Sequence, residues 1–245
     1  MRGRFVVREM PVFILAGGRG ERLAGVSDLP KPLLEIGGRP FLGYLFDGLA
    51  RAGFRRIHLL TGHRAEIFPE RLAGELEGHP ELEVEFLREE RPLGTGGALA
   101  RTLARVDRFA VVLNGDSFCA LDWPAFLRFH AEQPEALALA AVSVADARDY
   151  GALVLGEHGR LTGFREKGGE GAGWVNAGIY VLPRSFLEAI PARPASLEHE
   201  ILPAWIAREP GRVYCTQAYF CDIGTPERWR KACAELPRAA AGGVA

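Results

Sequence analysis

Apolar segments rich in strand-forming residues alternate with amphipathic segments of helical length through the first half of the chain. The apolar runs predict β-strands at residues 12–16, 56–60, 83–87, 109–114 and 136–144. The helical spacing of apolar residues predicts helices at residues 40–53, 64–74 and 96–106. This β-α-β order predicts an α/β fold with a mostly parallel sheet, and it places any ligand at the carboxyl ends of the strands.

Beyond Val144 the pattern changes to short strands separated by Gly-rich turns, which favours antiparallel pairing. The sequence "GEHGR" at residues 156–160 predicts a β-hairpin. No linker divides the chain, so we expect one domain over residues 11–235, preceded by an extension at 1–10. The small residues of "PRAAAGGVA" predict a flexible tail over residues 236–245.

The charge and the cysteines exclude several classes of protein. The 245 residues carry a formal net charge of -1, which gives no basis for binding nucleic acid or an anionic membrane surface. The segment "MRGRFVVREMP" has too short an apolar run for a signal peptide or a membrane span, so we expect a cytoplasmic protein. The cysteines have no metal-ligand spacing and are expected to be reduced thiols: Cys119, Cys215, Cys221 and Cys233.

The first predicted strand leads directly into the glycine-rich loop "LAGGRGERL" at residues 15–23. Glycines allow backbone N–H groups to converge on an anion, and Arg19 and Arg22 add positive charge, so such a loop is typical of a phosphate site. It lacks the Lys-Ser or Lys-Thr ending of a P-loop and the G-x-G-x-x-G of a dinucleotide site. A glycine-rich turn with solvated arginines explains the same residues equally well.

Four further features point to phosphate chemistry, and each has a simpler alternative. Two prolines hold the backbone extended around Lys31 and would aim its ammonium group, although most lysines are simply solvated. The turn "RPLGTGGALA", with Gly94 and Thr95, leads into a helix N-terminus and is a second candidate anion or polar-ring site. Asp116 in "VVLNGDS" and Asp222 in "CDIGTPERW" each follow a predicted strand. At such a position an aspartate is either a turn or cap residue or a metal ligand.

Two phosphate-binding turns, two strand-end carboxylates and separate cations together match the requirements of phosphoryl or nucleotidyl transfer. Mg²⁺ in such sites usually binds one or two carboxylates together with phosphate oxygens, while lysine and arginine neutralise the charge that builds up during transfer. No Ser/His/Asp or Cys/His arrangement stands out, so nothing favours a covalent intermediate. The combined pattern predicts a transferase that uses a nucleotide and Mg²⁺.

The motifs "LAGGRGERL", "PKPLLEIGGRP", "LGTGGA", "NGD", "FREK", "NAGIY" and "DIGTPE" occur in this order between Pro11 and about Glu235. Through them the chain resembles the sugar-1-phosphate nucleotidyltransferases of the glycosyltransferase-A-like superfold, and among these the enzymes that join GTP to heptose 1-phosphate. The resemblance implies a Rossmann-like fold with helices on both faces of a mixed, mostly parallel sheet. It also implies a nucleotide-binding half at about residues 11–135 and a sugar-phosphate-binding half at about 136–235.

The same resemblance implies transfer of a nucleoside monophosphate from a nucleoside triphosphate to a sugar 1-phosphate, with release of pyrophosphate. The implied catalytic residues are Arg22, Lys31, Asp116, Lys167 and Asp222, with Asp116 and Asp222 as the Mg²⁺ ligands. The implied nucleotide contacts are Leu15, Ala16, Gly17, Gly18, Gly20, Glu89, Gly94 and Thr95. The implied sugar-phosphate contacts are Gly151, Glu166, Lys167, Asn176 and Glu198.

Glu89 occupies the position that, in this family, faces the Watson–Crick edge of the base. A carboxylate only accepts hydrogen bonds, and guanine offers two adjacent donors where uracil and thymine offer one, so Glu89 favours GTP. The alternative is a surface ion pair with Arg88 or Arg91. Glu21 stands where the family usually has threonine, and a carboxylate there would repel a triphosphate. Its side chain could pair with Arg22 or Arg19 or ease the release of pyrophosphate, but we expect it to point outward.

Other functions stay open. A mannose-1-phosphate guanylyltransferase, or a uridylyl- or thymidylyltransferase, would carry the same motifs. An inactive homologue that senses an NDP-sugar would be expected to have lost one of the five catalytic residues, and all five are present. A glycosyltransferase of the same superfold would normally carry Asp-x-Asp where this chain has "NGDS". The expected partners are an NTP and a sugar 1-phosphate, without nucleic acid or membrane, and homo-oligomer formation stays open.

Overall fold

The computed structural model describes residues 6–18, 20, 23, 27–148, 150, 152–165 and 171–241. The chain forms two compact units that interleave along the sequence. The first unit comprises Met1–Pro92, Leu113–Ala120 and Cys221–Ala245, and the second comprises Leu93–Val112 and Leu121–Phe220. Two segments that follow Pro92 along the sequence, Leu113–Ala120 and Cys221–Ala245, thus return to the first unit.

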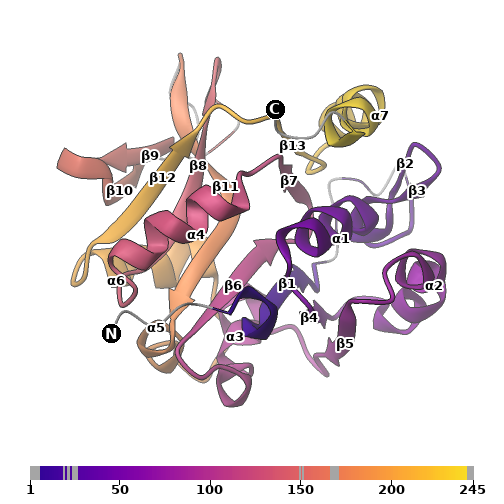
Figure 1. The fold of residues 1–245 in the computed structure, drawn as a ribbon, viewed down its shortest axis with the longest axis horizontal. Coiled ribbons are helices and arrows are strands. Elements are labelled where there is room, and N and C mark those ends of the chain that lie inside the picture. The colour runs from indigo at the N-terminus through magenta and orange to yellow at the C-terminus, as the bar shows by residue number, and fades with distance from the viewer. Residues whose placement is uncertain are drawn as a thin grey trace. The chain divides into compact units, whose positions relative to one another are not determined.

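In the first unit, β5, β4 and β1 lie side by side as parallel strands, as the sequence predicts (Figure 1). The main elements are β1 (Val12–Ala16), α1 (Phe41–Ala52), β4 (Arg56–Thr61), α2 (Phe68–Gly78) and β5 (Glu83–Arg88). Because the strands are parallel, all of them end at the same edge. The glycine loop follows β1 at this edge, and Glu89 follows β5 there.

Shorter strands complete the first unit. β2 (Glu35–Ile36) and β3 (Arg39–Pro40) form a small antiparallel hairpin directly before α1. β7 (Ser117–Cys119) pairs with β13 (Phe220–Asp222) in a separate two-stranded sheet. This second pairing matters for the site, because it brings together two segments that lie far apart in the sequence.

Helix α1 buries one continuous apolar face. Leu42, Leu45, Phe46 and Leu49 are all buried, at the three- and four-residue spacing that places side chains on one side of a helix. The helix ends at Gly53, whose φ of 92° lies in the left-handed region that favours glycine. The predicted helix at 40–53 is therefore confirmed, with both its apolar face and its terminating glycine.

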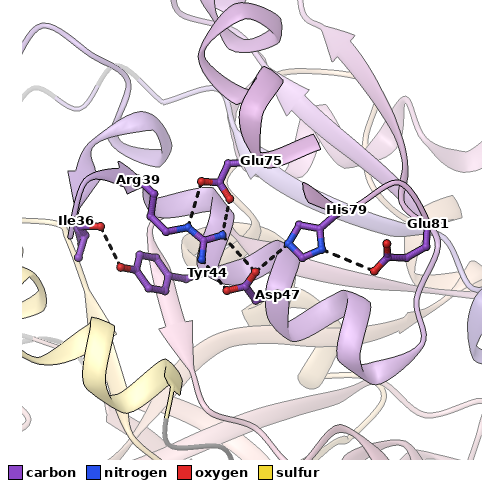
Figure 2. Close-up of polar contacts among 7 residues, drawn as sticks. All are labelled: Ile36, Arg39, Tyr44, Asp47, Glu75, His79 and Glu81. Carbon is purple, nitrogen blue, oxygen red and sulfur yellow. Dashed lines mark hydrogen bonds and ion pairs between the residues drawn. The ribbon is translucent and has the colours of Figure 1, made fainter. Parts of the chain in front are cut away.

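An ion-pair cluster links β3 to α1 and α2 within the first unit (Figure 2). Nη1 of Arg39 lies 2.8 Å from Oδ2 of Asp47, and the same guanidinium binds both carboxylate oxygens of Glu75. Nε2 of His79 lies 2.8 Å from Oδ1 of Asp47. Gly43 leaves room for this arrangement, because a Cβ atom there would lie only 2.6 Å from Nη2 of Arg39.

We expect Asp47→Asn to destabilise the protein at pH 7 by about 1–3 kcal/mol, because Arg39 then loses one of its two carboxylates. Burial raises the pKa of Asp47, but the hydrogen bonds and charges of Arg39 and His79 together outweigh burial, so this pKa lies below its ordinary value. A carboxylate with a lowered folded-state pKa stabilises the fold above its unfolded-state pKa, and this contribution is lost as the pH falls through the folded-state pKa. The wild type and the variant should therefore differ fully in their free energy of unfolding at pH 7, and this difference should shrink below about pH 4.

Urea denaturation at neutral and at acid pH measures this difference. Asp146→Asn is a matched control, because Asp146 forms its ion pair with Arg148 at an exposed position. The control should change the free energy of unfolding at neither pH. A difference between wild type and Asp47→Asn that stayed the same at both pH values would contradict a contribution from the charge of Asp47.

In the second unit, the strands form a mixed sheet in the order β6-β11-β8-β12-β10-β9. These strands are β6 (Phe109–Asn114, of which Phe109–Val112 belong to this unit), β8 (Ala138–Val144), β9 (Ala152–Leu155), β10 (Arg160–Arg165), β11 (Gly173–Pro183) and β12 (Gly211–Thr216). β12 is parallel to β8, whereas β11 is antiparallel to β8 and β10 is antiparallel to β9 and β12. The change to antiparallel pairing after Val144 is confirmed, and so is the hairpin around residues 156–160.

The helices of the second unit are short. They are α3 (Gly94–Ala100), α4 (Trp123–Glu132), α5 (Arg184–Glu188) and α6 (Leu202–Ile206), and the π-helical turn Leu197–Ile201 precedes α6. The helix predicted at 96–106 is interrupted after α3, where the hydroxyl of Thr102 donates a hydrogen bond to the carbonyl of Leu99 at 2.7 Å. Within the described part of the chain, no helix has the length and apolar character needed to span a membrane.

Helix α7 (Pro226–Ala241) of the first unit corrects the prediction of a flexible tail over residues 236–245. The helix continues through Pro237 to Ala241. Leu236 is fully buried and the ring of Pro237 lies against Gly37, so packing outweighs the low helical propensity of proline. The last four residues of the predicted tail lie outside the described residues.

Candidate active site

The glycine loop begins at the end of β1 and is held to two neighbouring segments of the first unit. The carbonyl of Leu15 accepts a hydrogen bond from the N–H of Gly115 at 3.0 Å. The carbonyl of Gly17 accepts one from the N–H of His63 at 3.3 Å. The start of the predicted nucleotide loop, including Ala16 and Gly18, is therefore anchored at the carboxyl edge of the parallel strands, as the sequence predicts.

Lys31 points at Asp116. Its Nζ lies 3.0 Å from Oδ2 of Asp116, and its side chain is only 15% exposed. Lys31 opens a short 3₁₀ turn with Pro32 as its second residue. The backbone of Gly20 lies against the lysine, since a Cβ on Gly20 would lie 3.2 Å from Cγ of Lys31, and the φ of 67° at Gly20 also favours glycine. Lys31 is therefore not the solvated surface lysine of the simpler alternative.

Asp116 and Asp222 lie on neighbouring segments of the first unit. The N–H of Ile223 donates to the carbonyl of Asp116 at 3.0 Å, and the pairing of β7 with β13 continues this contact. The side chain of Asp222 is buried, and its Oδ1 accepts hydrogen bonds from the N–H of Gly224 and from Nη1 of Arg228, both at 2.9 Å. Backbone pairing between distant parts of the sequence thus places Asp116 and Asp222 on adjacent segments.

Each of these carboxylates forms an ion pair with a basic side chain, and one of these side chains, Arg228, was not predicted from the sequence. Lys31 forms an ion pair with Asp116, and Arg228 forms one with Asp222. Arg228 lies in the first turn of α7, whose start is capped by the hydroxyl of Thr225, which accepts a hydrogen bond from the N–H of Arg228 at 3.3 Å. A cation in the first turn of a helix opposes the helix dipole, and this unfavourable placement is the signal that would have singled out Arg228.

The chemistry of these two side chains fits a hard divalent cation, because carboxylate oxygens are the ligands that such ions prefer. Among the described residues, no three or more His, Cys, Asp and Glu side chains gather into a group able to hold a metal by themselves. A cation at Asp116 and Asp222 would complete its coordination with substrate phosphate oxygens and water, which is the usual arrangement for Mg²⁺.

Glu89 points toward the glycine loop. Its N–H donates to the carbonyl of Thr61 at 2.9 Å, which fixes the backbone just beyond β5. A Cβ atom on Gly17 would lie 2.8 Å from Oε1 of Glu89, and one on Gly62 would lie closer still. The carboxylate therefore rests over two glycines at the ends of β1 and β4, where any side chain larger than hydrogen would displace it.

Gly94 and Thr95 lie in the second unit and bind a different segment of the chain. A Cβ on Gly94 would lie 2.5 Å from the carbonyl oxygen of Ala195, and the N–H of Gly96 donates to that oxygen at 2.9 Å. Oγ1 of Thr95 accepts a hydrogen bond from the N–H of Leu197 at 2.8 Å. The glycines of this turn therefore permit close backbone packing, a use that the sequence reasoning did not foresee; a role in nucleotide binding stays a prediction.

Asn176 and Glu198, both predicted to contact the sugar, come together in the second unit around a third residue. Nδ2 of Asn176 lies 2.6 Å from the hydroxyl oxygen of Tyr180 and 3.5 Å from Oε1 of Glu198. The hydroxyl of Tyr180 donates to Oε1 of Glu198 at 3.0 Å. The motif "NAGIY" contains Tyr180, but the sequence reasoning assigned it no role, because nothing local shows that its hydroxyl reaches Glu198.

Several predicted residues lie outside the described residues: Arg22, Gly151, Glu166 and Lys167. The same holds for Arg19 and Glu21, so the expected outward orientation of Glu21 stays an expectation. The described candidate residues divide between the units. Leu15, Ala16, Gly17, Gly18, Gly20, Lys31, Glu89, Asp116 and Asp222 lie in the first unit, and Gly94, Thr95, Asn176 and Glu198 lie in the second.

The chain belongs to the nucleotidyl transferase family, whose model matches residues 12–238. Among curated proteins, it is 31% identical over 230 residues to D-glycero-alpha-D-manno-heptose 1-phosphate guanylyltransferase of Aneurinibacillus thermoaerophilus, covering 93% of this chain and 98% of that enzyme. It is 33% identical over 237 residues to mannose-1-phosphate guanylyltransferase of Mycobacterium tuberculosis, covering 94% of this chain. That match covers 65% of the mycobacterial enzyme, so the chain spans about two thirds of its length.

A solved structure has the same fold over nearly its whole length. The crystal structure of HddC from Yersinia pseudotuberculosis complexed with GMP-PN matches with a TM-score of 0.83 and 34% sequence identity, covering 93% of this chain and 99% of that one. The family and the α/β fold predicted from the motifs are therefore confirmed.

Proposed function

We propose that this chain is a sugar-1-phosphate guanylyltransferase, which transfers GMP from GTP to a sugar 1-phosphate and releases pyrophosphate. The observation that carries the proposal is the backbone pairing that places Asp116 and Asp222 on adjacent segments, with Lys31 in an ion pair with Asp116, at the edge where the glycine loop begins. Heptose 1-phosphate is the favoured acceptor, because the match to the heptose enzyme covers 98% of that relative.

The proposed reaction needs positioning and charge neutralisation and no covalent enzyme intermediate. A phosphate oxygen of the sugar 1-phosphate attacks the α-phosphorus of GTP, forming a new P–O bond. The bond between the α-phosphorus and the oxygen that bridges to the β-phosphate breaks, and pyrophosphate leaves with that electron pair. Holding the two reactants in line and neutralising the negative charge supplies most of the acceleration in such transfers.

On the nucleotide side, Leu15 to Gly18 hold the nucleoside and Glu89 accepts hydrogen bonds from guanine, and Gly94 and Thr95 are further proposed nucleotide contacts. Gly20, Arg22 and Lys31 bind the triphosphate and the departing pyrophosphate. Asp116 and Asp222 hold Mg²⁺, which when bound would neutralise charge on the phosphate oxygens. Lys31 and Arg228 already offset these two carboxylates when no metal is bound.

On the sugar side, Lys167 binds the phosphate of the acceptor. Glu166 and Glu198 accept hydrogen bonds from the ring hydroxyls, the amide of Asn176 can accept or donate one, and the backbone at Gly151 contributes to the same contact. The clustering of Asn176 and Glu198 in the second unit supports a shared role for these two residues.

A second candidate is a mannose-1-phosphate guanylyltransferase, which the 33% identity to the mycobacterial enzyme supports. The two candidates share the nucleotide and differ in the acceptor. An inactive homologue that senses an NDP-sugar is a third, and measured turnover separates it from both.

The test is a matrix of GTP, UTP and dTTP against the 1-phosphates of D-glycero-D-manno-heptose, mannose and glucose, with Mg²⁺ and with pyrophosphate release as the readout. We expect release with GTP and the heptose, and reactions without a sugar phosphate are the control. The highest rate with mannose 1-phosphate would transfer the assignment to the second candidate. The absence of release in every combination would contradict the proposed activity.

A further inference from the structure

The hydroxyl of Tyr180 is buried between two residues with predicted sugar contacts. Tyr180 is the largest fully buried side chain among the residues that the structure describes, with an exposed fraction of 0%. Its oxygen lies 2.6 Å from Nδ2 of Asn176 and 3.0 Å from Oε1 of Glu198. Because burying a hydroxyl is costly unless it is hydrogen-bonded, these two partners fix where the hydroxyl points.

The hydrogen bonds of this group run in one direction. The N–H of Gly178 donates to Oδ1 of Asn176 at 2.9 Å, so the other end of the amide, Nδ2, faces Tyr180. Nδ2 only donates, so the oxygen of Tyr180 accepts from it and donates its own hydrogen to Glu198. This series of hydrogen bonds ends at the carboxylate of Glu198, which can only accept.

The backbone around these residues is irregular in ways that support one fixed arrangement. β11 changes register between Asn176 and Tyr180, and Gly178 has a φ of 72°. Glu198 stands in the π-helical turn Leu197–Ile201, a rare conformation that occurs often at functional sites. The hydrogen bond from the N–H of Leu197 to Thr95 holds the start of this turn.

We infer that Tyr180 is a positioning residue for the acceptor sugar: its hydroxyl holds Asn176 and Glu198 in the orientation in which they bind the sugar hydroxyls. A glutamate side chain has several rotatable bonds, so without Tyr180 the carboxylate would have to be ordered each time the sugar binds. This inference rests on the proposed function, and it adds a residue that contacts neither the nucleotide nor the reacting phosphates.

The experiment is steady-state kinetics of Tyr180→Phe, using whichever of heptose 1-phosphate and mannose 1-phosphate gives the higher wild-type rate. We expect KM for the sugar 1-phosphate to rise about 10-fold, because the ordering of Asn176 and Glu198 is lost. The KM for GTP should stay within about twofold, and kcat should fall less than the sugar KM rises.

The matched control is Tyr44→Phe, which removes another buried tyrosine hydroxyl. The hydroxyl of Tyr44 donates to the carbonyl of Ile36 at 2.9 Å, in the first unit and within the cluster of Figure 2. Its hydrogen-bond partner is not a predicted site residue, so both KM values should stay at the wild-type level. Thermal unfolding of both variants shows whether they lose similar stability, which separates a positioning effect from a general loss of structure.

A double mutant tests whether Tyr180 acts through Glu198. If it does, Tyr180→Phe should raise the sugar KM clearly less in the Glu198→Ala background than in the wild type, since the residue it positions is absent. Equal effects in both backgrounds, equal rises in the KM for GTP and sugar, or an equal rise for Tyr44→Phe would each overturn the inference. Failure of the proposed function is a different result, because the wild type itself would then release no pyrophosphate.

Discussion

Asp116→Asn and Asp222→Asn should each reduce kcat at least about 10²-fold, while the protein stays folded. Asparagine keeps the shape of aspartate but removes the charge, so the proposed Mg²⁺ site loses one of its two anionic ligands. Charge on the α-phosphate in the transition state is then less well neutralised, and this kind of electrostatic stabilisation is often the largest single contribution to catalysis. Pyrophosphate release at saturating substrates measures kcat, and thermal unfolding measures the fold.

The dependence on Mg²⁺ adds a second readout. Both variants should need more Mg²⁺ for half-maximal rate than the wild type does. Asp122→Asn is a suitable control, because Asp122 caps α4 through a hydrogen bond from the N–H of Ala125 at 2.9 Å, and asparagine caps helices equally well. If both site variants turned over GTP at nearly the wild-type rate in saturating Mg²⁺, these residues would not be the metal ligands.

Glu89→Gln should lower the preference for GTP over UTP by tens- to hundreds-fold in kcat/KM. A carboxylate accepts from both N1–H and the N2 amine of guanine, whereas uracil presents carbonyl oxygens that would face the charge. Leaving such buried acceptors against an anion costs on the order of 2–4 kcal/mol, which corresponds to discrimination of this size. The position of the carboxylate over Gly17 and Gly62 supports this role.

The neighbouring Glu90 offers a matched control for Glu89, because it is exposed and follows directly in the sequence. Glu90→Gln should leave the ratio of kcat/KM for GTP and UTP unchanged, and Glu89→Gln should leave the KM for the sugar 1-phosphate unchanged. Wild-type enzyme that used UTP or dTTP as readily as GTP would show that Glu89 does not select guanine.

Local patterns in the sequence were enough to predict the strands. The segments at 12–16 and 56–60 are strands because short, β-rich apolar runs bounded by turn residues fit buried parallel strands, and this preference does not depend on distant residues. The glycine motifs likewise marked real turns, since Gly20 and Gly94 have the positive φ that favours glycine. Motif order along the chain was enough to identify the family.

The end of the chain shows where local reasoning failed. Residues 236–241 read as a flexible tail because proline and small residues disfavour ordered structure. In the folded protein, Leu236 is buried in the first unit and Pro237 lies against Gly37, and these contacts keep the segment helical. Contacts with residues about two hundred positions away cannot be derived from the tail's own composition.

The sequence by itself determined the alternation of strands and helices, the family and the identity of the charged residues that such chemistry needs. The tertiary structure alone decided which of those residues meet. Lys31 pairs with Asp116, Arg228 with Asp222, and the hydroxyl of Tyr180 joins Asn176 to Glu198. The physical reason is that propensity and periodicity act over a few residues, whereas ion pairs and hydrogen bonds between distant segments form only where the packed strands bring them within about 3 Å.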